Sequence, residues 1–253
     1  MKKPFKAVLI ILLCMLWVTP AAAQDEGNIG TLVKITAKDG HDEALITAIT
    51  DYHKWIANFD GAMRYNWYRT LTGPDTGVYY AFSGGHDWAD FDAEYDWQEK
   101  AGEVFMENVW PHVDDMDRMM VRTMGDWSHW PENWEGYDLF HLTDWYVKNG
   151  QYSAFRKGME RITKALKEGG YKSHWGFHWM ESGGKAGHLV LVSPTKGWGG
   201  MAAEDPSFYD IMVKDLGSAE AFDEFMADWG ATFKQGAVQT VKWMPDASDY
   251  GDD

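Results

Sequence analysis

Four polar side chains in two matching segments of the sequence could carry acid/base chemistry. Asn66 and Tyr68 are two positions apart in one segment, and His174 and His178 are four positions apart in the other. Residues two or four positions apart lie on the same face of a β-strand. Amide, phenol and imidazole groups on one face can exchange protons and hydrogen bonds with a bound molecule. We therefore take these four residues as candidate catalytic groups.

The spacing of His174 and His178 would suit a metal ion on a helix, where both imidazoles reach one ion. The surrounding residues alternate as in a strand instead. Four residues at about 3.3 Å each separate the two side chains by roughly 13 Å, which is too far for one ion. The sequence therefore predicts no metal site.

Candidate ligand-binding residues lie on the same strand faces and on two loops. Lys34, Arg64, Asp144 and Tyr146 are on the polar strand faces, and Trp88 and Trp198 are on loops next to glycines. Polar groups could orient a ligand, and the two tryptophans could stack on a sugar or an aromatic ring. Two alternatives stay open. The polar residues could be solvated or satisfy one another without a ligand, and the tryptophans could fill a core or the seam between two halves.

An internal repeat positions these residues. Lys38-Asp39-Gly40 matches Lys148-Asn149-Gly150, which lies 110 positions later, and the same offset pairs Trp88 with Trp198. One ungapped offset that aligns a turn and a loop tryptophan indicates a duplicated unit.

Each unit is predicted to have the element order β-α-β-β-α-β, from strand alternation and helical spacing of its apolar residues. In the first unit the predicted elements are strand 31–37, helix 42–58, hairpin arms 64–71 and 78–83, helix 95–119 and a short strand 120–124. In the second unit they are 141–147, 151–168, 174–181, 188–193, 217–235 and 238–244.

This order, found twice, resembles the dimeric α/β-barrel (ferredoxin-like) superfamily, which includes antibiotic-biosynthesis-type monooxygenases, NIPSNAP-like proteins and haem-handling barrels. The expected fold class is α+β, with two tandem ferredoxin-like βαββαβ repeats packed as a pseudo-dimeric α/β barrel. The repeats are expected at 24–125 and 138–245, with a linker at 126–137 and an acidic tail at 246–253. The bare sheet faces of the two halves are expected to face each other.

Residues 1–23 have the features of a secretory signal: lysines, an apolar run, and small residues before Gln24. We expect a periplasmic or secreted protein with no membrane insertion after cleavage. The only cysteine, Cys14, lies in this segment, which excludes thiol catalysis in the mature chain. A formal charge of -16 repels phosphate backbones, so nucleic acid is excluded as a partner.

The expected function is the binding of a small aromatic or hydrophobic molecule between the halves of a monomeric, internally pseudo-dimeric chain. The resemblance implies oxidative chemistry, without a cofactor or with haem, or isomerisation. No cofactor is predicted from the residues themselves, and His174 or His178 would be the lone haem ligand. The alternatives are a non-catalytic envelope interaction protein and a carbohydrate-binding protein that uses Trp88 and Trp198.

Overall fold

The computed structural model describes residues 27–202 and 204–248. The expected signal segment 1–23 and the end of the expected acidic tail lie outside these ranges. Within them, no helix combines the length and the apolar character needed to cross a membrane.

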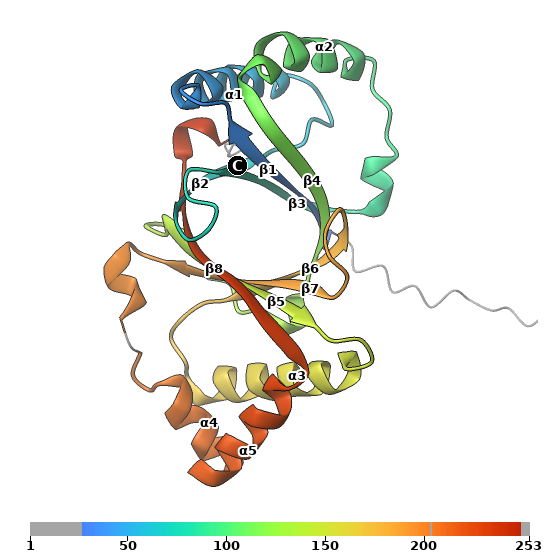
Figure 1. Cartoon of the computed structure of the whole chain (residues 1–253). Helices are drawn as coiled ribbons and strands as arrows, with labels where there is room; N and C mark the ends of the chain where they lie inside the picture. Colours follow the sequence, from blue (N-terminus) through green and yellow to red (C-terminus); the bar gives the residue numbers. More distant parts are fainter. Residues whose placement is uncertain (1–26, 203, 249–253) are drawn as a thin grey trace, which may run out of the picture.

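Each half of the chain supplies strands and the helices that cover them (Figure 1). The first half contains β1 (Ile29–Ala37), α1 (Asp42–Ile56), β2 (Asn66–Thr72), β3 (Tyr79–His86), α2 (Gln98–Asn108) and β4 (Val113–Thr123). The second half contains β5 (Leu139–Val147), α3 (Tyr152–Gly169), β6 (Gly176–Ser182), β7 (His188–Thr195), α4 (Phe208–Leu216), α5 (Ala219–Gly230) and β8 (Phe233–Trp243). Short 3₁₀ turns are η1 (Trp88–Phe91), η2 (Trp110–His112), η3 (Gly125–Trp127), η4 (Trp198–Met201) and η5 (Pro245–Ala247).

The strands form one closed barrel in the order β1-β3-β2-β8-β5-β7-β6-β4. The two sheets join where β2 pairs with β8 and β4 pairs with β6, both antiparallel. Tyr68 lies opposite Trp243 at the first seam, and Thr123 lies opposite His178 at the second. These pairings confirm the expected fold class. The bare sheet faces become the inner wall of the barrel because the sheet edges are hydrogen-bonded to each other.

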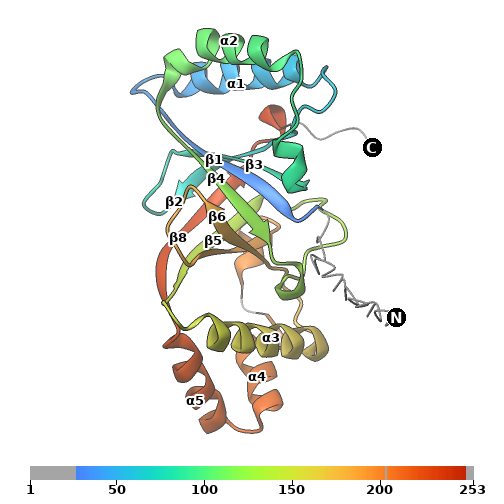
Figure 2. The same ribbon diagram turned by 90° about the vertical axis from the view of Figure 1, so that its right-hand side faces the viewer.

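Helices cover the outside of the barrel (Figures 1 and 2). An apolar core lies beneath each helical layer. Apolar residues four positions apart share one helix face. On α3, this spacing buries Phe155 and Met159 in the core of the second half. On α1, Leu45 and Ile49 pack with Ile35 of β1 in the core of the first half. A third, smaller cluster lies inside the barrel.

The boundary between the last helix and the last strand of the first half differs from the prediction. The helix predicted over 95–119 ends at Asn108, and the strand predicted over 120–124 is the longer strand β4. Pro111 explains the early end, because proline has no N–H to continue a helix and clashes with the preceding turn.

The helix predicted over 217–235 is shorter in the structure, where it is α5, and a further helix that was not predicted, α4, precedes it. They meet at Gly217, whose φ of 96° is the left-handed conformation that ends many helices. The hydroxyl of Ser218 then accepts a hydrogen bond from the backbone N–H of Ala221 and caps α5.

Both segments that the sequence placed outside the repeats pack against the barrel. Trp127, from the expected linker, is buried in the core of the second half. Ala247, from the start of the expected tail, is buried in the core of the first half. The hydroxyl of Ser248 accepts a hydrogen bond from the backbone N–H of Trp67 at 2.8 Å. The chain after β8 therefore returns to the first half.

Candidate functional site

A cavity of about 900 Å³ extends into the barrel beside the end of β4. Its inner wall is made of strand residues that are mostly apolar: Leu32, Tyr68, Tyr80, Phe140, Leu142, Val190, Val192 and Val241. Its outer part also touches polar residues, among them Asn28, Arg122, Asp126 and Arg156. Pockets of roughly 300–1,000 Å³ with mostly apolar walls and a few polar groups are typical sites for small molecules.

Six aromatic residues of the cavity lining form a continuous series of ring contacts, the aromatic belt. The centroid distances are Phe82–His178 at 5.1 Å, His178–Trp130 at 5.8 Å, Trp130–Trp134 at 5.7 Å, Trp134–Phe140 at 6.1 Å and Phe140–Tyr68 at 5.0 Å. Rings at such separations attract each other. The belt includes strands of both halves and the segment that connects them.

His178 lies within the belt, and its imidazole is neutral at physiological pH. Burial lowers the pKa of His178 to about 4, because the charged form loses its hydration in an apolar wall. Its remaining exposure is to the cavity that it lines. Nδ1 is hydrogen-bonded to the hydroxyl of Thr123 at 3.1 Å. Among the described residues, no hydrogen bond to the other ring nitrogen, Nε2, is found.

Asn66 and Tyr68 lie on β2 and line the same cavity. Asn66 is the cross-strand partner of Phe82, whose ring contacts His178, so the amide and the imidazole both adjoin this ring. Oδ1 of Asn66 is buried without a hydrogen-bond partner among the described residues. A buried acceptor without a partner costs about 1–3 kcal/mol.

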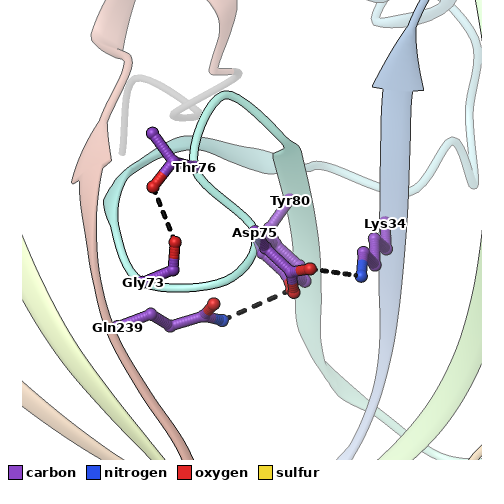
Figure 3. A network of polar contacts seen from close by, with 6 residues as sticks. All are labelled: Lys34, Gly73, Asp75, Thr76, Tyr80 and Gln239. Atoms are coloured by element: carbon purple, nitrogen blue, oxygen red, sulfur yellow. Dashed lines mark hydrogen bonds and ion pairs between the residues drawn. The ribbon is translucent and has the colours of Figure 1, made fainter.

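A polar network joins the loop between β2 and β3 to the strands of the barrel (Figure 3). The loop between β2 and β3 folds inward so that Asp75 meets Lys34 at 2.9 Å and accepts a hydrogen bond from the Tyr80 hydroxyl at 2.6 Å. Gln239 donates to the same hydroxyl at 3.3 Å. Burial alone would raise the pKa of Asp75, but the hydrogen bonds from Tyr80 and Lys34 hold this pKa below its usual value. Gly73 lets the loop approach β8, because a Cβ there would lie 2.7 Å from the Cβ of Gln239.

Replacing Asp75 with alanine is expected to destabilise the protein by about 1–3 kcal/mol, because Lys34 and Tyr80 lose their shared acceptor. Urea unfolding at pH 7 measures this change. Thr76→Ala is the control in the same loop: it removes a hydrogen bond to the carbonyl of Gly73 that is exposed to solvent, and we expect a loss below about 1 kcal/mol. Equal losses in the two variants would contradict the role of the network.

Asp144 and Tyr146 contact other side chains of the protein and are absent from the cavity lining. Oδ1 of Asp144 lies 3.0 Å from Nε2 of His188, and the Tyr146 ring stacks on the His188 ring at 4.7 Å. Lys34 is engaged by Asp75 in the same way. These three predicted ligand-binding residues therefore all contact other side chains of the chain.

The remaining predicted site residues lie away from the cavity. Arg64 and His174 precede the first residues of β2 and β6, so strand alternation does not apply to them. Arg64 donates to the carbonyl of Ala57, and Nδ1 of His174 lies 3.2 Å from the carbonyl oxygen of His129. Trp88 and Trp198 are exposed, at 46% and 55%.

Trp130 and Trp134, which the sequence analysis did not select, belong to the cavity wall. Both lie in the expected linker, where the close spacing of several tryptophans could have indicated a binding site. Thr123 was also missed, because it was placed at the end of a short strand rather than opposite His178.

The residues around the cavity fit a haem group poorly. Within the ranges that the structure describes, His178 is the single histidine of the cavity lining, and its neighbours on the belt lie close to its ring. Two arginines could meet the haem carboxylates, but Arg122 already pairs with Glu181 at 2.6 Å and Arg156 with Glu160 at 3.3 Å. Among the described residues, no group of three or more histidine, cysteine or acidic side chains could hold a metal ion.

The sequence matches no protein-family model and no curated protein. The structure is similar to that of a protein assigned as a monooxygenase from Lactobacillus acidophilus, with a TM-score of 0.52, 12% identity and coverage of 86% of this chain and 94% of that one. The structure of an anthrone oxidase-like protein also gives a TM-score of 0.52, with 12% identity and coverage of 87% of this chain and 92% of that one. A protein assigned as a monooxygenase from Fusobacterium nucleatum gives a TM-score of 0.52, with 10% identity and coverage of 87% of this chain and 93% of that one. These similarities show a shared fold, the dimeric α/β barrel.

Proposed function

We propose that this chain binds one small planar aromatic molecule in its barrel cavity and oxidises it with molecular oxygen. The observation that carries the proposal is the aromatic belt around a neutral imidazole, inside an apolar cavity of about 900 Å³. Aromatic walls favour a flat ligand, and His178 and Asn66 provide polar groups to orient it. The anthrone oxidase-like neighbour has a name that agrees with this substrate class.

The proposed reaction converts an acidic ring CH₂ group, as in anthrone, to a ketone. Nε2 of His178 takes one proton from this carbon, and the resulting carbanion transfers electrons to O₂. Overall the carbon loses two hydrogens and gains one oxygen atom, and the other oxygen atom leaves as water, so no external reductant is needed. The apolar wall excludes bulk water, and the positive charge formed on the imidazole is stabilised by the adjacent substrate anion.

The two halves do not provide equivalent sites, so one ligand per chain is expected. With the offset of 110 positions, Tyr68 corresponds to His178, and Asn66 corresponds to Gly176. Only one half therefore supplies the imidazole. Closure of the barrel uses both edges of each sheet, so a single chain completes the cavity.

Isothermal titration with 2-naphthol, a flat aromatic alcohol, tests the binding step. We expect one binding site per chain, and a dissociation constant raised roughly tenfold or more in Val192→Phe, because the added ring fills part of the cavity. Val238→Phe is the matched control, because Val238 is 44% exposed on β8. Absence of binding, or equal weakening in both variants, would contradict the proposed site.

A second candidate function is carbohydrate binding at the exposed rings of Trp88 and Trp198, which meet the accessibility that sugar stacking requires. Loss of sugar binding in Trp88→Ala and Trp198→Ala, with 2-naphthol binding unchanged, would support it. Export is part of both proposals and is supported by the signal features of residues 1–23.

A further inference from the structure

The segment that carries Trp130 is fixed along the start of β6 by backbone hydrogen bonds. The N–H of Met124 donates to the carbonyl of Phe177 at 2.8 Å. His129 and Trp175 exchange two such bonds, at 2.7 and 3.1 Å. Trp130 therefore follows directly from a residue that is paired with the sheet, and its backbone position is set by this pairing.

Gly176, the first residue of β6, leaves the space that the Trp130 indole occupies. A Cβ at this position would lie 1.6 Å from Cζ2 of Trp130 and 2.0 Å from its Cη2. Gly176 is not among the glycines with positive φ, so its backbone conformation does not require glycine. The absence of a side chain therefore serves the close approach of the indole. The repeat-related position in the first half is Asn66, which does carry a side chain.

The Trp130 indole lies next to the groups that would contact a ligand. Its centroid is 5.8 Å from the His178 ring and 5.7 Å from the Trp134 ring, and Trp130 lines the cavity. Indole is the largest aromatic side chain, and a ring held in one position stacks on a ligand at little cost in conformational entropy.

We infer that Gly176 and Trp130 act as a pair that determines specificity: Gly176 positions the Trp130 indole, and the indole selects planar over saturated ring ligands. This inference rests on the proposed function, because it concerns the ligand of the same cavity. Trp130 would contact the ligand, whereas Gly176 would act only through Trp130.

The test compares the dissociation constants of 2-naphthol and decahydro-2-naphthol, two alcohols with the same carbon skeleton, of which only the first is flat. For the wild-type protein we expect a preference for 2-naphthol of roughly three- to tenfold. Trp130→Ala and Gly176→Ala should each reduce this preference to about one, and Trp130→Phe should restore part of it. Trp198→Ala, which removes an exposed indole, should leave it unchanged.

A double-mutant cycle isolates the positioning role of Gly176. In the Trp130→Ala background the added methyl group meets no indole, so Gly176→Ala should cause no further change in either dissociation constant. This comparison uses only the Trp130→Ala protein and the double variant, so it can be made even if Gly176→Ala alone does not fold. A wild-type protein that binds neither alcohol would contradict the proposed function itself. Binding of both alcohols with equal affinity, or a preference that survives in Trp130→Ala, would overturn this inference and leave the cavity as a binding site. A preference lost in Trp130→Ala but kept in Gly176→Ala would overturn the role of Gly176.

Discussion

His178→Gln is expected to reduce the rate of oxygen consumption with anthrone as substrate by about 10²-fold, the lower end of the usual contribution of a positioned general base, because the lowered pKa makes this imidazole a weak base. Glutamine retains polar character beside Thr123 but cannot accept a proton from the substrate at neutral pH. An oxygen electrode measures the rate, and thermal unfolding checks that the variant folds.

His174→Gln is the matched control for this substitution, because His174 lies outside the cavity lining and contacts the carbonyl of His129. We expect its rate to stay within about twofold of the wild type, since it does not touch the reacting atoms. Full activity in His178→Gln, or an equal loss in the two variants, would show that the imidazole of His178 is not the base.

The same side chain is expected to make the protein sensitive to acid. In the unfolded chain His178 takes up a proton near its ordinary pKa of 6.5, whereas in the folded protein it does so at about 4. Between these pH values the unfolded state holds more protons, so the free energy of unfolding falls as the pH is lowered from 6.5 to 4. The expected loss from this group is about 3 kcal/mol, with no further loss below pH 4.

Urea unfolding of the wild type and of His178→Gln at pH 7, 5.5 and 4 measures this contribution. The wild type should lose about 3 kcal/mol more than the variant between pH 7 and 4. Other histidines with lowered pKa values, such as His86 and His141, are present in both proteins and cancel in the difference. Parallel pH profiles would show that His178 is not buried as the structure describes.

The repeat and most strands could be predicted because both leave local patterns in the sequence. Strand alternation placed Asn66, Tyr68 and His178 on one face, and the structure brings them to one cavity wall. The same reasoning was wrong for Arg64 and His174, because these residues precede the strands and alternation applies only while the chain stays extended. Their positions depend on strand ends that sequence patterns define poorly.

The other differences arise from contacts between segments that are distant in the sequence. Lys34 faces inward as expected, but the hairpin loop that carries Asp75 reaches it from 41 residues away. Trp130 enters the cavity wall because its segment pairs with Trp175, a contact that no local spacing reveals. The absence of a side chain at Gly176 is meaningful only once this pairing is known.

A crystal structure of the protein grown with 2-naphthol would show whether the barrel cavity holds the ligand. We expect density for one naphthol per chain inside the barrel, in contact with His178 and the Trp130 indole. Naphthol bound only on the exposed rings of Trp88 or Trp198, with an empty barrel at concentrations that saturate binding in solution, would contradict it.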